Sequence, residues 1–440
     1  MQDYFFSIAD AIPPLLRGTE IFTCSFHGEA SDFVRFNRGA VRQAGAVVQR
    51  SLTIDLIDGR RHAAGTLTLA GDGPGDRARL AHVIGELRDI RAHLADDPYL
   101  HYATEVRSTE RRRSAVLPDG EAVIDAVGAA AAARDLVGIY AGGSNHVGFA
   151  NSFGQRNWYT APSFNLDWSF FHDADKAVKA SYAGTVWQAD ELDRRMRTAA
   201  EQLAVLARPA RALSPGRYRV YLSPAALYEI LGVLSWGGFG LRAHRTKTTP
   251  LIRMVDGEVR LHPSVRIVEN TAGGIAPDFQ DAGFIRPERV TLIEKGAYRD
   301  CLVSPRSAAE YDVATNGASA SEVPASIEVE PGSIPADQVM RELHTGLYIG
   351  NLWYLNFSDR TACRTTGMTR FATFWVERGV IQSPVEVMRF DETVYRWLGE
   401  NLIGLTAERE LILDAGSYFQ RSTDSARLPG ILVDDFTLTL

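Results

Sequence analysis

Apolar and polar residues alternate with a period of two in three short segments near the N-terminus. The segments are Ile21–Phe26, Ser51–Ile57 and Ala64–Leu69, and Asp58-Gly59 provides a turn signal between the last two. Successive side chains of a strand point to opposite faces, so this alternation places one face of each segment against a core. The pattern therefore predicts three strands in an antiparallel meander.

Helical spacing replaces this alternation in longer segments. Apolar residues recur three and four positions apart over residues 75–95 and again from Asp190 to about Arg208, and an alanine-rich helix is expected from Glu121 to Leu136. Residues 137–190 are strand-like, rich in aromatic side chains and punctuated by glycine. The first half of the chain thus combines an antiparallel sheet with helices.

A boundary follows at Ser214-Pro215-Gly216, which gives predicted domains at residues 1–212 and 213–440. Alternation then returns at Arg217–Leu222, ahead of a short helix from Pro224 to about Ser235. The remaining expected elements are a mobile polar loop at 314–321, a helix from Asp391 to about Ile403, and strands at 264–269, 289–294, 300–303, 326–330, 346–355, 371–377 and 430–440. The predicted fold class is α+β, with a mixed N-terminal domain and a β-rich C-terminal domain.

Composition narrows the classes of function. The 440 residues are 45% hydrophobic and 23% charged, and this length favours two domains or more. With 47 Lys+Arg against 54 Asp+Glu the net charge is −7, which argues against nucleic acid as the main partner. No apolar stretch reaches the roughly 18 residues of a membrane span, and the N-terminus lacks a signal-peptide pattern. We therefore expect a cytoplasmic protein without a membrane partner.

The common catalytic motifs are missing from the sequence. The ten histidines include no His-Glu-x-x-His spacing, and no two of them are closer than eight residues. There is no Gly-x-Ser-x-Gly elbow and no phosphate-binding loop, and Gly237–Gly240 is interpreted as a hinge after a helix. Cys24, Cys301 and Cys363 are widely separated, which predicts neither a disulfide framework nor a cysteine zinc site.

Two basic clusters and one cysteine remain as candidates for anion binding or for a reactive thiol. Arg111–Arg113 is predicted to be a solvated loop, and Arg242–Lys247 is either a solvated loop or a site for an anion such as a carboxylate. Cys363 stands near Arg360 and Arg364, which could lower the pKa of its thiol, although no base is evident. Without further information, the residues indicate a two-domain α+β protein and assign it no reaction.

An ordered set of short motifs carries a resemblance across nearly the whole chain. Residues 138–143, Gly-Ile-Tyr-Ala-Gly-Gly, followed by residues 148–154, Gly-Phe-Ala-Asn-Ser-Phe-Gly, resemble the TldD/TldE (PmbA) peptidase family. The further matching motifs are Val34–Gly39, Arg42-Gln43, Trp168-Ser169, Asp175–Val178, Gly346–Ile349 with Trp353, Trp375–Val380 and Pro384-Val385. Each motif is short, and their shared order is what makes the resemblance specific.

The resemblance implies where a metal site would lie. The active, TldD-like subunit of that family carries His-Glu-x-x-x-His on a helix and a C-terminal cysteine, which together hold a hydrolytic zinc ion. The matching helix here is Tyr228–Val233, which keeps Glu229 but has Tyr228 and Val233 at the two histidine positions. The C-terminal segment 414–419 has no cysteine. The resemblance therefore implies a TldE-like chain with no metal site and no catalytic residue, in which Glu229 is a relic.

The resemblance also implies a function and partners. It predicts a metal-free subunit of a heterodimeric zinc metallopeptidase, paired with a TldD-like subunit that holds the zinc and acting on unfolded or modified peptides. An extended peptide can be held by strand-like main-chain bonds. The expected substrate-binding residues are Asn351, Trp353, Tyr354, Asn356 and Arg370. Trp353 and Tyr354 could instead be core or dimer-interface residues.

Two other classes of function stay open at this point. The first is an autonomous hydrolase that uses Cys363 or a serine. The second is a non-enzymatic homodimer that binds peptides, and a homodimer is also the form expected for a TldE-like chain that lacks its partner.

Overall fold

The computed structural model describes residues 1–131, 134–173 and 176–440, and its fold class is α+β, as predicted. Two sheets dominate it. The first is a seven-stranded sheet whose strands follow the order β3-β2-β1-β5-β6-β4, with β7 beside β6. Its strands are β1 (Ile21–Asn37), β2 (Ala40–Asp58), β3 (Arg61–Thr68), β4 (Thr109–Arg112), β5 (Asp135–Asn151), β6 (Arg156–Asp173) and β7 (Lys176–Gly184).

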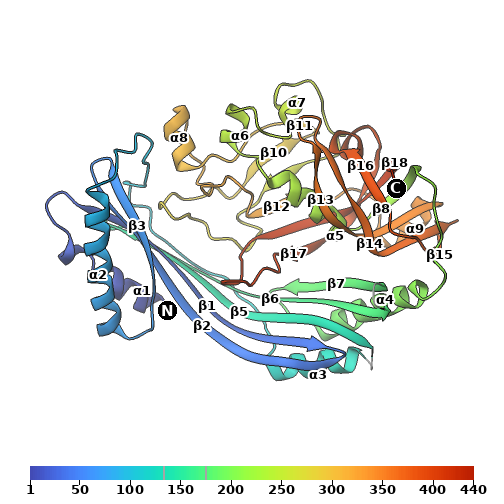
Figure 1. The fold of residues 1–440 in the computed structure, drawn as a ribbon, viewed down its shortest axis with the longest axis horizontal. Helices are drawn as coiled ribbons and strands as arrows, with labels where there is room; N and C mark the ends of the chain where they lie inside the picture. The colour runs from blue at the N-terminus through green and yellow to red at the C-terminus, as the bar shows by residue number, and fades with distance from the viewer. Residues whose placement is uncertain (132–133, 174–175) are drawn as a thin grey trace.

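The predicted meander is confirmed. Strand β1 pairs antiparallel with β2 from Ile21 opposite Ile57 to Asn37 opposite Ala40, and β2 pairs antiparallel with β3. Gly59 takes a φ of +59° in the turn between β2 and β3, a conformation that glycine adopts without a steric cost. Strands β1 and β2 continue far beyond the predicted segments, and the sheet forms a long curved platform below the C-terminal half of the chain (Figure 1).

Helices cover the two ends of this platform (Figure 1). At one end, α1 (Gln2–Ala9) and α2 (Gly73–Arg91) share a core with the first three strands. At the other end, α3 (Gly120–Ala131) and α4 (Ala189–Leu206) pack on the sheet, together with Phe374 of the C-terminal half. The predicted alanine-rich helix is found up to Ala131, whereas Asp135 and Leu136 of the predicted range belong to β5; residues 132–133 lie outside the described residues.

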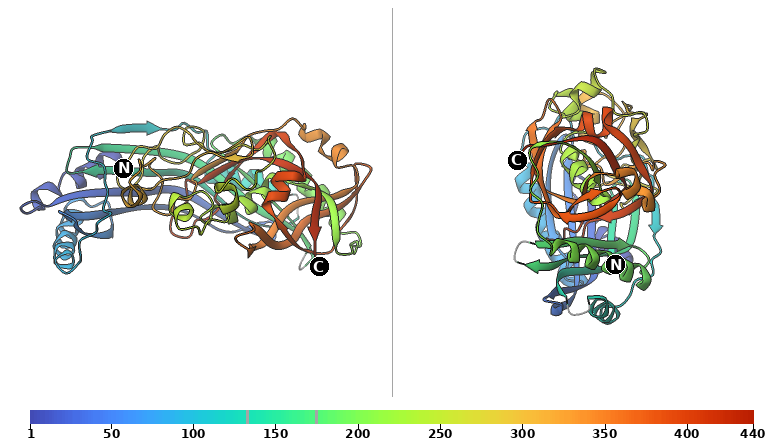
Figure 2. Two further views of the ribbon diagram at one scale, coloured as in Figure 1. Left: turned by 90° about the horizontal axis from the view of Figure 1, so that it is seen from above. Right: turned by 90° about the vertical axis from the view of Figure 1, so that its right-hand side faces the viewer.

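The second sheet has eleven strands, in the order β11-β10-β9-β12-β18-β16-β14-β13-β8, with β15 beside β14 and β17 beside β18. A further pairing of β18 with β8 closes β8, β13, β14, β16 and β18 into a ring (Figure 2). The strands are β8 (Gly216–Leu222), β9 (Ile267–Glu269), β10 (Val290–Glu294), β11 (Ala297–Tyr298), β12 (Ser326–Val329), β13 (Gly346–Asp359), β14 (Arg364–Glu377), β15 (Val380–Pro384), β16 (Arg389–Thr393), β17 (Leu402–Leu413) and β18 (Ser425–Leu438).

Helix α5 (Pro224–Ser235) lies inside this ring and has the predicted bounds (Figure 2). It starts at Ser223, whose hydroxyl accepts a hydrogen bond from Ala226 N, with Pro224 at the first helical position. Its buried residues are Pro224, Ala226, Leu227, Ile230, Leu231, Val233, Leu234 and Ser235. A helix that is apolar nearly all round has to be enclosed, which the ring of strands achieves.

Short helices complete the C-terminal half, and the sequence did not predict them. They are α6 (Leu241–Arg245), α7 (Ile252–Val255), α8 (Pro305–Tyr311) and α9 (Val339–Leu343). Among the described residues, none of the helices combines the length and apolar character that a membrane crossing requires. The predicted division at residues 212 and 213 lies between α4 and β8 and stays a prediction.

Three local predictions are wrong. The helix expected over Asp391–Ile403 is strand β16 up to Thr393, then a single helical turn that ends where Gly399 leaves helical geometry, with β17 beginning at Leu402. Asp391 pairs with Thr366 of β14 and Thr393 pairs with Arg364, so sheet pairing overrides the helical spacing. The basic cluster Arg111–Arg113 lies on and just after the edge strand β4, where Arg111 pairs with Tyr159.

The third wrong prediction is the strand at 300–303. Only an isolated bridge between Leu302 and Gly240 forms there, and the regular strand is β11, a few residues earlier. The main chain at Cys301 and Val303 is instead bonded by the side chain of Asn316. A side chain from a distant loop thus satisfies groups that a sheet would otherwise use.

Candidate functional site

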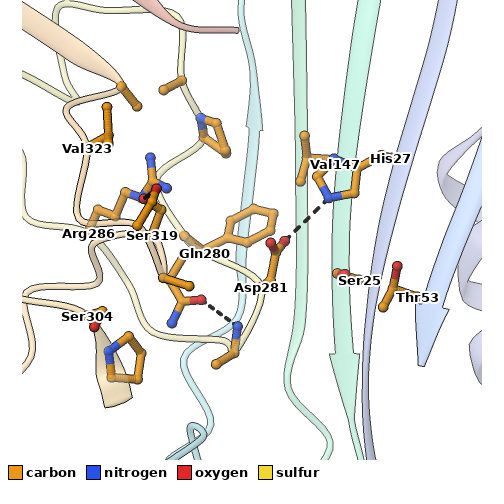
Figure 3. Close-up of a pocket in the computed structure, with 18 of the residues that line it drawn as sticks. Ser25, His27, Thr53, Val147, Gln280, Asp281, Arg286, Ser304, Ser319 and Val323 are labelled. Carbon is orange, nitrogen blue, oxygen red and sulfur yellow. Dashed lines mark hydrogen bonds and ion pairs between the residues drawn. The ribbon is translucent and has the colours of Figure 1, made fainter. Parts of the chain in front are cut away.

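Two cavities lie between the seven-stranded platform and the C-terminal half. The larger has a volume of about 870 Å³ and is lined by Ser25, His27 and Thr53 of the platform and by loops of the C-terminal half (Figure 3). His27 Nε2 lies 3.4 Å from Asp281 Oδ1, and this contact links the two sides of the cavity. The lining is mixed in charge.

The smaller cavity, of about 320 Å³, is lined by three of the residues that the sequence singled out, Tyr228, Glu229 and Asn351. Tyr228 and Glu229 reach it from α5, and Asp167 and Lys179 reach it from β6 and β7. Asp414-Ala415, directly after β17, completes the wall. The fold therefore brings the helix at 228–233 and the segment at 414–419 to one place, although they are far apart in the sequence.

Helix geometry separates the two positions that the resemblance paired. Tyr228 and Val233 are five residues apart, which on a regular helix places their side chains about 140° apart. Tyr228 is half-buried against the cavity, whereas Val233 is 4% exposed and is not among the residues that line the cavity. Only the first half of the predicted motif faces the cavity.

Burial controls the charges in the smaller cavity. It raises the pKa of the Glu229 carboxyl, while Lys179 acts in the opposite direction. Burial also raises the pKa of the Asp167 carboxyl to about 6, and it raises the pKa of the Tyr228 phenol. The carboxyl and phenol groups of the lining thus lie beside Lys179, Arg194 and Arg195.

This donor set does not fit a hydrolytic zinc site. Such a site uses imidazole or thiolate ligands and an open position, and the side chains lining the smaller cavity include neither. In the part of the chain that the structure describes, no group of three or more His, Cys, Asp or Glu side chains is arranged to hold a metal ion.

The segment Asp414–Asp424, between β17 and β18, lies between the two cavities. Its first residues line the smaller cavity, and its last five, Gln420–Asp424, line the larger. Arg421 holds the segment on the platform, because its guanidinium donates to Ser163 O and Ser163 Oγ, both at 2.8 Å, and to Gly143 O at 3.2 Å. Sequence reasoning missed this anchor, because nothing in a short polar segment distinguishes a buried arginine from a solvated one.

A family sequence model shows to which protein family the chain belongs. The model described as the PmbA/TldA metallopeptidase C-terminal domain matches residues 215–440, just over half of the chain. The chain belongs to the PmbA/TldD family. The family is related to metallopeptidases, and the resemblance stated from the motifs is confirmed.

Solved structures share the whole fold of this PmbA/TldD family chain. TldE from Thermococcus kodakarensis aligns with a TM-score of 0.76 and 12% identity, over 98% of this chain and 99% of that one. A candidate modulator of DNA gyrase from Thermotoga maritima aligns with a TM-score of 0.75 and 13% identity, over 99% of this chain and 100% of that one. A similarly described protein from Bacteroides thetaiotaomicron gives 0.73 and 13%, over 99% and 98%. No curated protein sequence matches the chain.

Most of the family motifs lie on the strands of the platform and of the ring. Residues 138–143 and 148–151 belong to β5, and Gly346–Ile349 and Trp353 belong to β13. Gly143 has a φ of +150°, and a Cβ there would lie 2.1 Å from Ala30 O of the neighbouring strand. That position can hold only glycine. Asp175, at the start of another motif, lies outside the described residues.

The predicted peptide-binding residues are spread over β13 and β14 of this PmbA/TldD family chain. Asn351 lines the smaller cavity, and its side-chain amide donates to Lys179 O at 3.3 Å. Trp353 and Tyr354 are 43% and 78% exposed, and the Arg370 guanidinium lies 4.4 Å from the centre of the Trp353 ring. Asn356 is exposed further along β13. Trp353 and Tyr354 are thus not core residues, and contact of these side chains with a peptide stays a prediction.

We expect the three cysteines to resist a thiol-reactive probe at neutral pH in the folded protein. All three are buried. Burial raises the pKa of Cys24 and of Cys363 to about 12, and it raises the pKa of Cys301 as well. A buried thiol stays protonated and is a poor nucleophile. Mass spectrometry after labelling would show modification only in denatured protein; rapid labelling of folded protein at Cys363, lost in Cys363→Ser, would contradict this.

Proposed function

We propose that this chain is a metal-free, non-catalytic, TldE-like subunit of a heterodimeric zinc metallopeptidase that acts on unfolded or modified peptides. Its partner is a TldD-like subunit, which supplies the zinc and the catalytic residues. The chain itself contributes the walls that bind and orient an extended peptide. Peptide maturation and peptide degradation are the two processes that this activity serves.

One observation carries the proposal. The smaller cavity gathers Tyr228, Glu229 and Asp414, and this donor set offers carboxyl and phenol oxygens where the family's active subunit has imidazole and thiolate. Membership of a metallopeptidase-related family supports the peptide as substrate class. The all-chain similarity to a protein named TldE supports the choice of branch, at the level of the fold.

The burial of Cys363 argues against the alternative of an autonomous thiol hydrolase. This cysteine is 0% exposed, and its thiol pKa is about 12, so Arg360 does not offset the effect of burial. A catalytic thiol needs an accessible site and a lowered pKa. The homodimeric peptide-binding protein remains the second candidate, because it requires no catalytic group.

The test is a comparison of the chain alone with the chain plus a TldD-like subunit. Purified alone, the chain should bind less than one zinc per molecule and should cleave no unfolded peptide. With the partner, cleavage should appear, and zinc should be found in the partner by metal analysis of the separated subunits. The peptide should bind the pair more tightly than it binds the partner alone.

Glu229→Ala separates a relic from a catalytic base. If the glutamate only fills the cavity, the variant should change the cleavage rate of the complex by less than about threefold, whereas losing a general base costs about 10²- to 10⁴-fold. Glu258→Ala is the matched control at an exposed position. Cleavage by the chain alone that disappears in Glu229→Ala would refute the proposal.

A further inference from the structure

Strands β13 and β14 carry a row of polar and aromatic side chains to the smaller cavity. Asn351 of β13 stands opposite Arg370 of β14, and Trp353 follows two residues after Asn351. Opposed residues of an antiparallel pair, and residues two apart in one strand, point to the same side of a sheet. Asn351 lines the cavity, so Trp353 and Arg370 continue the face that borders it.

The Arg370 guanidinium is stacked on aromatic rings. It lies 4.4 Å from the centre of the Trp353 ring and 5.4 Å from the centre of the Phe371 ring. Stacking uses the flat faces of a guanidinium and leaves the N–H groups at its edge for other partners. Within residues 1–131, 134–173 and 176–440, no oxygen accepts a hydrogen bond from these groups. Arg370 thus presents donors that are oriented but unused.

Arg370 also differs from other cations at the cavity. Arg195 pairs with Glu191 at 2.6 Å, and Lys179 lies close enough to the Asp167 carboxyl to stabilise its charge. In the part of the chain that the structure describes, no carboxylate lies within ion-pair distance of Arg370. A planar guanidinium binds a carboxylate through two parallel N–H···O bonds. A carboxylate is therefore the group that the free edge of Arg370 matches.

The main chain around this pair has features that are common at binding sites. Tyr354 and Phe371 have φ values of +56° and +62°, in the left-handed region that bulky residues seldom adopt. The pairing of β13 with β14 shifts its register between Trp353 and Asn356, which marks a bulge. Bulges and strained residues gather where a side chain has to be aimed at a ligand. Here they flank Trp353 and Arg370.

We propose that Arg370, positioned by Trp353, binds a carboxylate group of the peptide that enters the smaller cavity. The carboxylate belongs to an acidic side chain or to the C-terminus of the peptide, since both offer the same planar pair of oxygens. This inference rests on the proposed function, because it takes a peptide as the substrate, and it adds a preference among peptides. Arg370 touches the ligand, whereas Trp353 acts through Arg370 and is a positioning residue.

The test compares the affinities of four peptides for the full chain. All four have one Gly/Ser/Ala-rich sequence and a neutral coumarin label at the N-terminus. The first has a central glutamate and a free C-terminus, the second has glutamine instead, the third has an amidated C-terminus, and the fourth has both changes. By fluorescence anisotropy at low ionic strength, the fourth should bind about tenfold more weakly than the first. The second and third show which carboxylate is responsible.

Variants of the chain assign this discrimination to Arg370. Arg370→Gln should weaken binding of the first peptide about tenfold and leave binding of the fourth unchanged. Arg370→Lys keeps the charge but not the planar pair of donors, so its discrimination should be intermediate. Trp353→Leu should reduce the discrimination, and Trp353→Phe, which keeps an aromatic face, should restore it. Arg299→Gln, at a position that is 69% exposed, is the matched control and should change neither affinity.

The possible outcomes separate this inference from the proposed function. Equal affinity of the unmodified chain for all four peptides would overturn the carboxylate site, and so would the absence of any peptide binding. Discrimination that survives in Arg370→Gln, with an unchanged thermal midpoint, would overturn it too. None of these measurements needs zinc or a partner. Discrimination without cleavage after addition of a TldD-like subunit would therefore refute the proposed function and leave the carboxylate site standing, whereas cleavage without discrimination would refute the carboxylate site alone.

Discussion

Replacing Arg421 by alanine is expected to lower the free energy of unfolding by about 3–5 kcal/mol. Arg421 is 5% exposed, and Ser163, which accepts two of its hydrogen bonds, is 0% exposed. Glu29, 1% exposed, accepts a bond from the main-chain N–H of Arg421. Removal of the guanidinium leaves buried acceptors without donors and a buried carboxylate without its neighbouring positive charge, and both are costly.

Arg421→Lys and Arg299→Ala provide the controls. Lysine keeps the charge but cannot reach several acceptors with one planar group, so we expect an intermediate loss. Arg299 is 69% exposed, and its removal should change stability by no more than about 0.5 kcal/mol. Denaturant unfolding gives these values, and hydrogen exchange should show faster opening of Asp414–Asp424. Equal stability of Arg421→Ala and Arg299→Ala would show that the segment is not anchored as described.

Replacing Glu269 by glutamine is expected to change how stability depends on pH. Glu269 is 6% exposed on β9, and its carboxyl accepts hydrogen bonds from the main-chain N–H groups of Ala325 and Ser326. Burial, the largest influence, raises the pKa of this carboxyl from 4.5 to about 7, although those hydrogen bonds and Arg286 act to lower it.

The direction in which stability changes with pH follows from the pKa of the Glu269 carboxyl in the unfolded chain and in the folded chain. Below pH 4.5 the carboxyl is protonated in the folded and the unfolded chain, so it imposes no cost. Between pH 4.5 and about 7 the unfolded chain ionises first, and the folded state loses stability with rising pH. Each pH unit in this interval is worth about 1.4 kcal/mol, so the cost reaches about 3 kcal/mol above pH 7.

Glutamine carries no charge and avoids this cost. The free energy of unfolding of Glu269→Gln, relative to the unmodified chain, should therefore rise by about 3 kcal/mol between pH 4.5 and pH 8. Denaturant unfolding at several pH values measures the difference, in which all other titrating groups cancel. Glu258→Gln, at an exposed position, is the matched control. A constant difference for Glu269→Gln would contradict the raised pKa.

Local signals in the sequence predicted the elements that depend on neighbouring residues. Helix α5 has the predicted bounds because Ser223 caps it, Pro224 opens it and glycines follow it. The meander formed as expected because its alternation and its turn are local. The helix expected over Asp391–Ile403 failed because pairing between β16 and β14, which join distant parts of the chain, decided its first residues.

In the candidate site, too, some features could be predicted from the sequence and others depended on distant contacts. The sequence pointed to Tyr228, Glu229 and segment 414–419 separately, through a family resemblance. Only the fold showed that Glu229 and Asp414 line one cavity and that Val233 is buried away from it. Among the expected peptide contacts, it placed Asn351 in the cavity and left Tyr354 on the surface.

By itself, the sequence determined the fold class, the family, the bounds of α5 and the absence of histidine at positions 228 and 233. These follow from residue types and short-range spacing, which are present in the chain before it folds. The tertiary structure decided the burial of Arg421 and Glu269 and the cavity beside Glu229. These depend on which distant segments exclude water from one another, and only a complete arrangement of the strands establishes that.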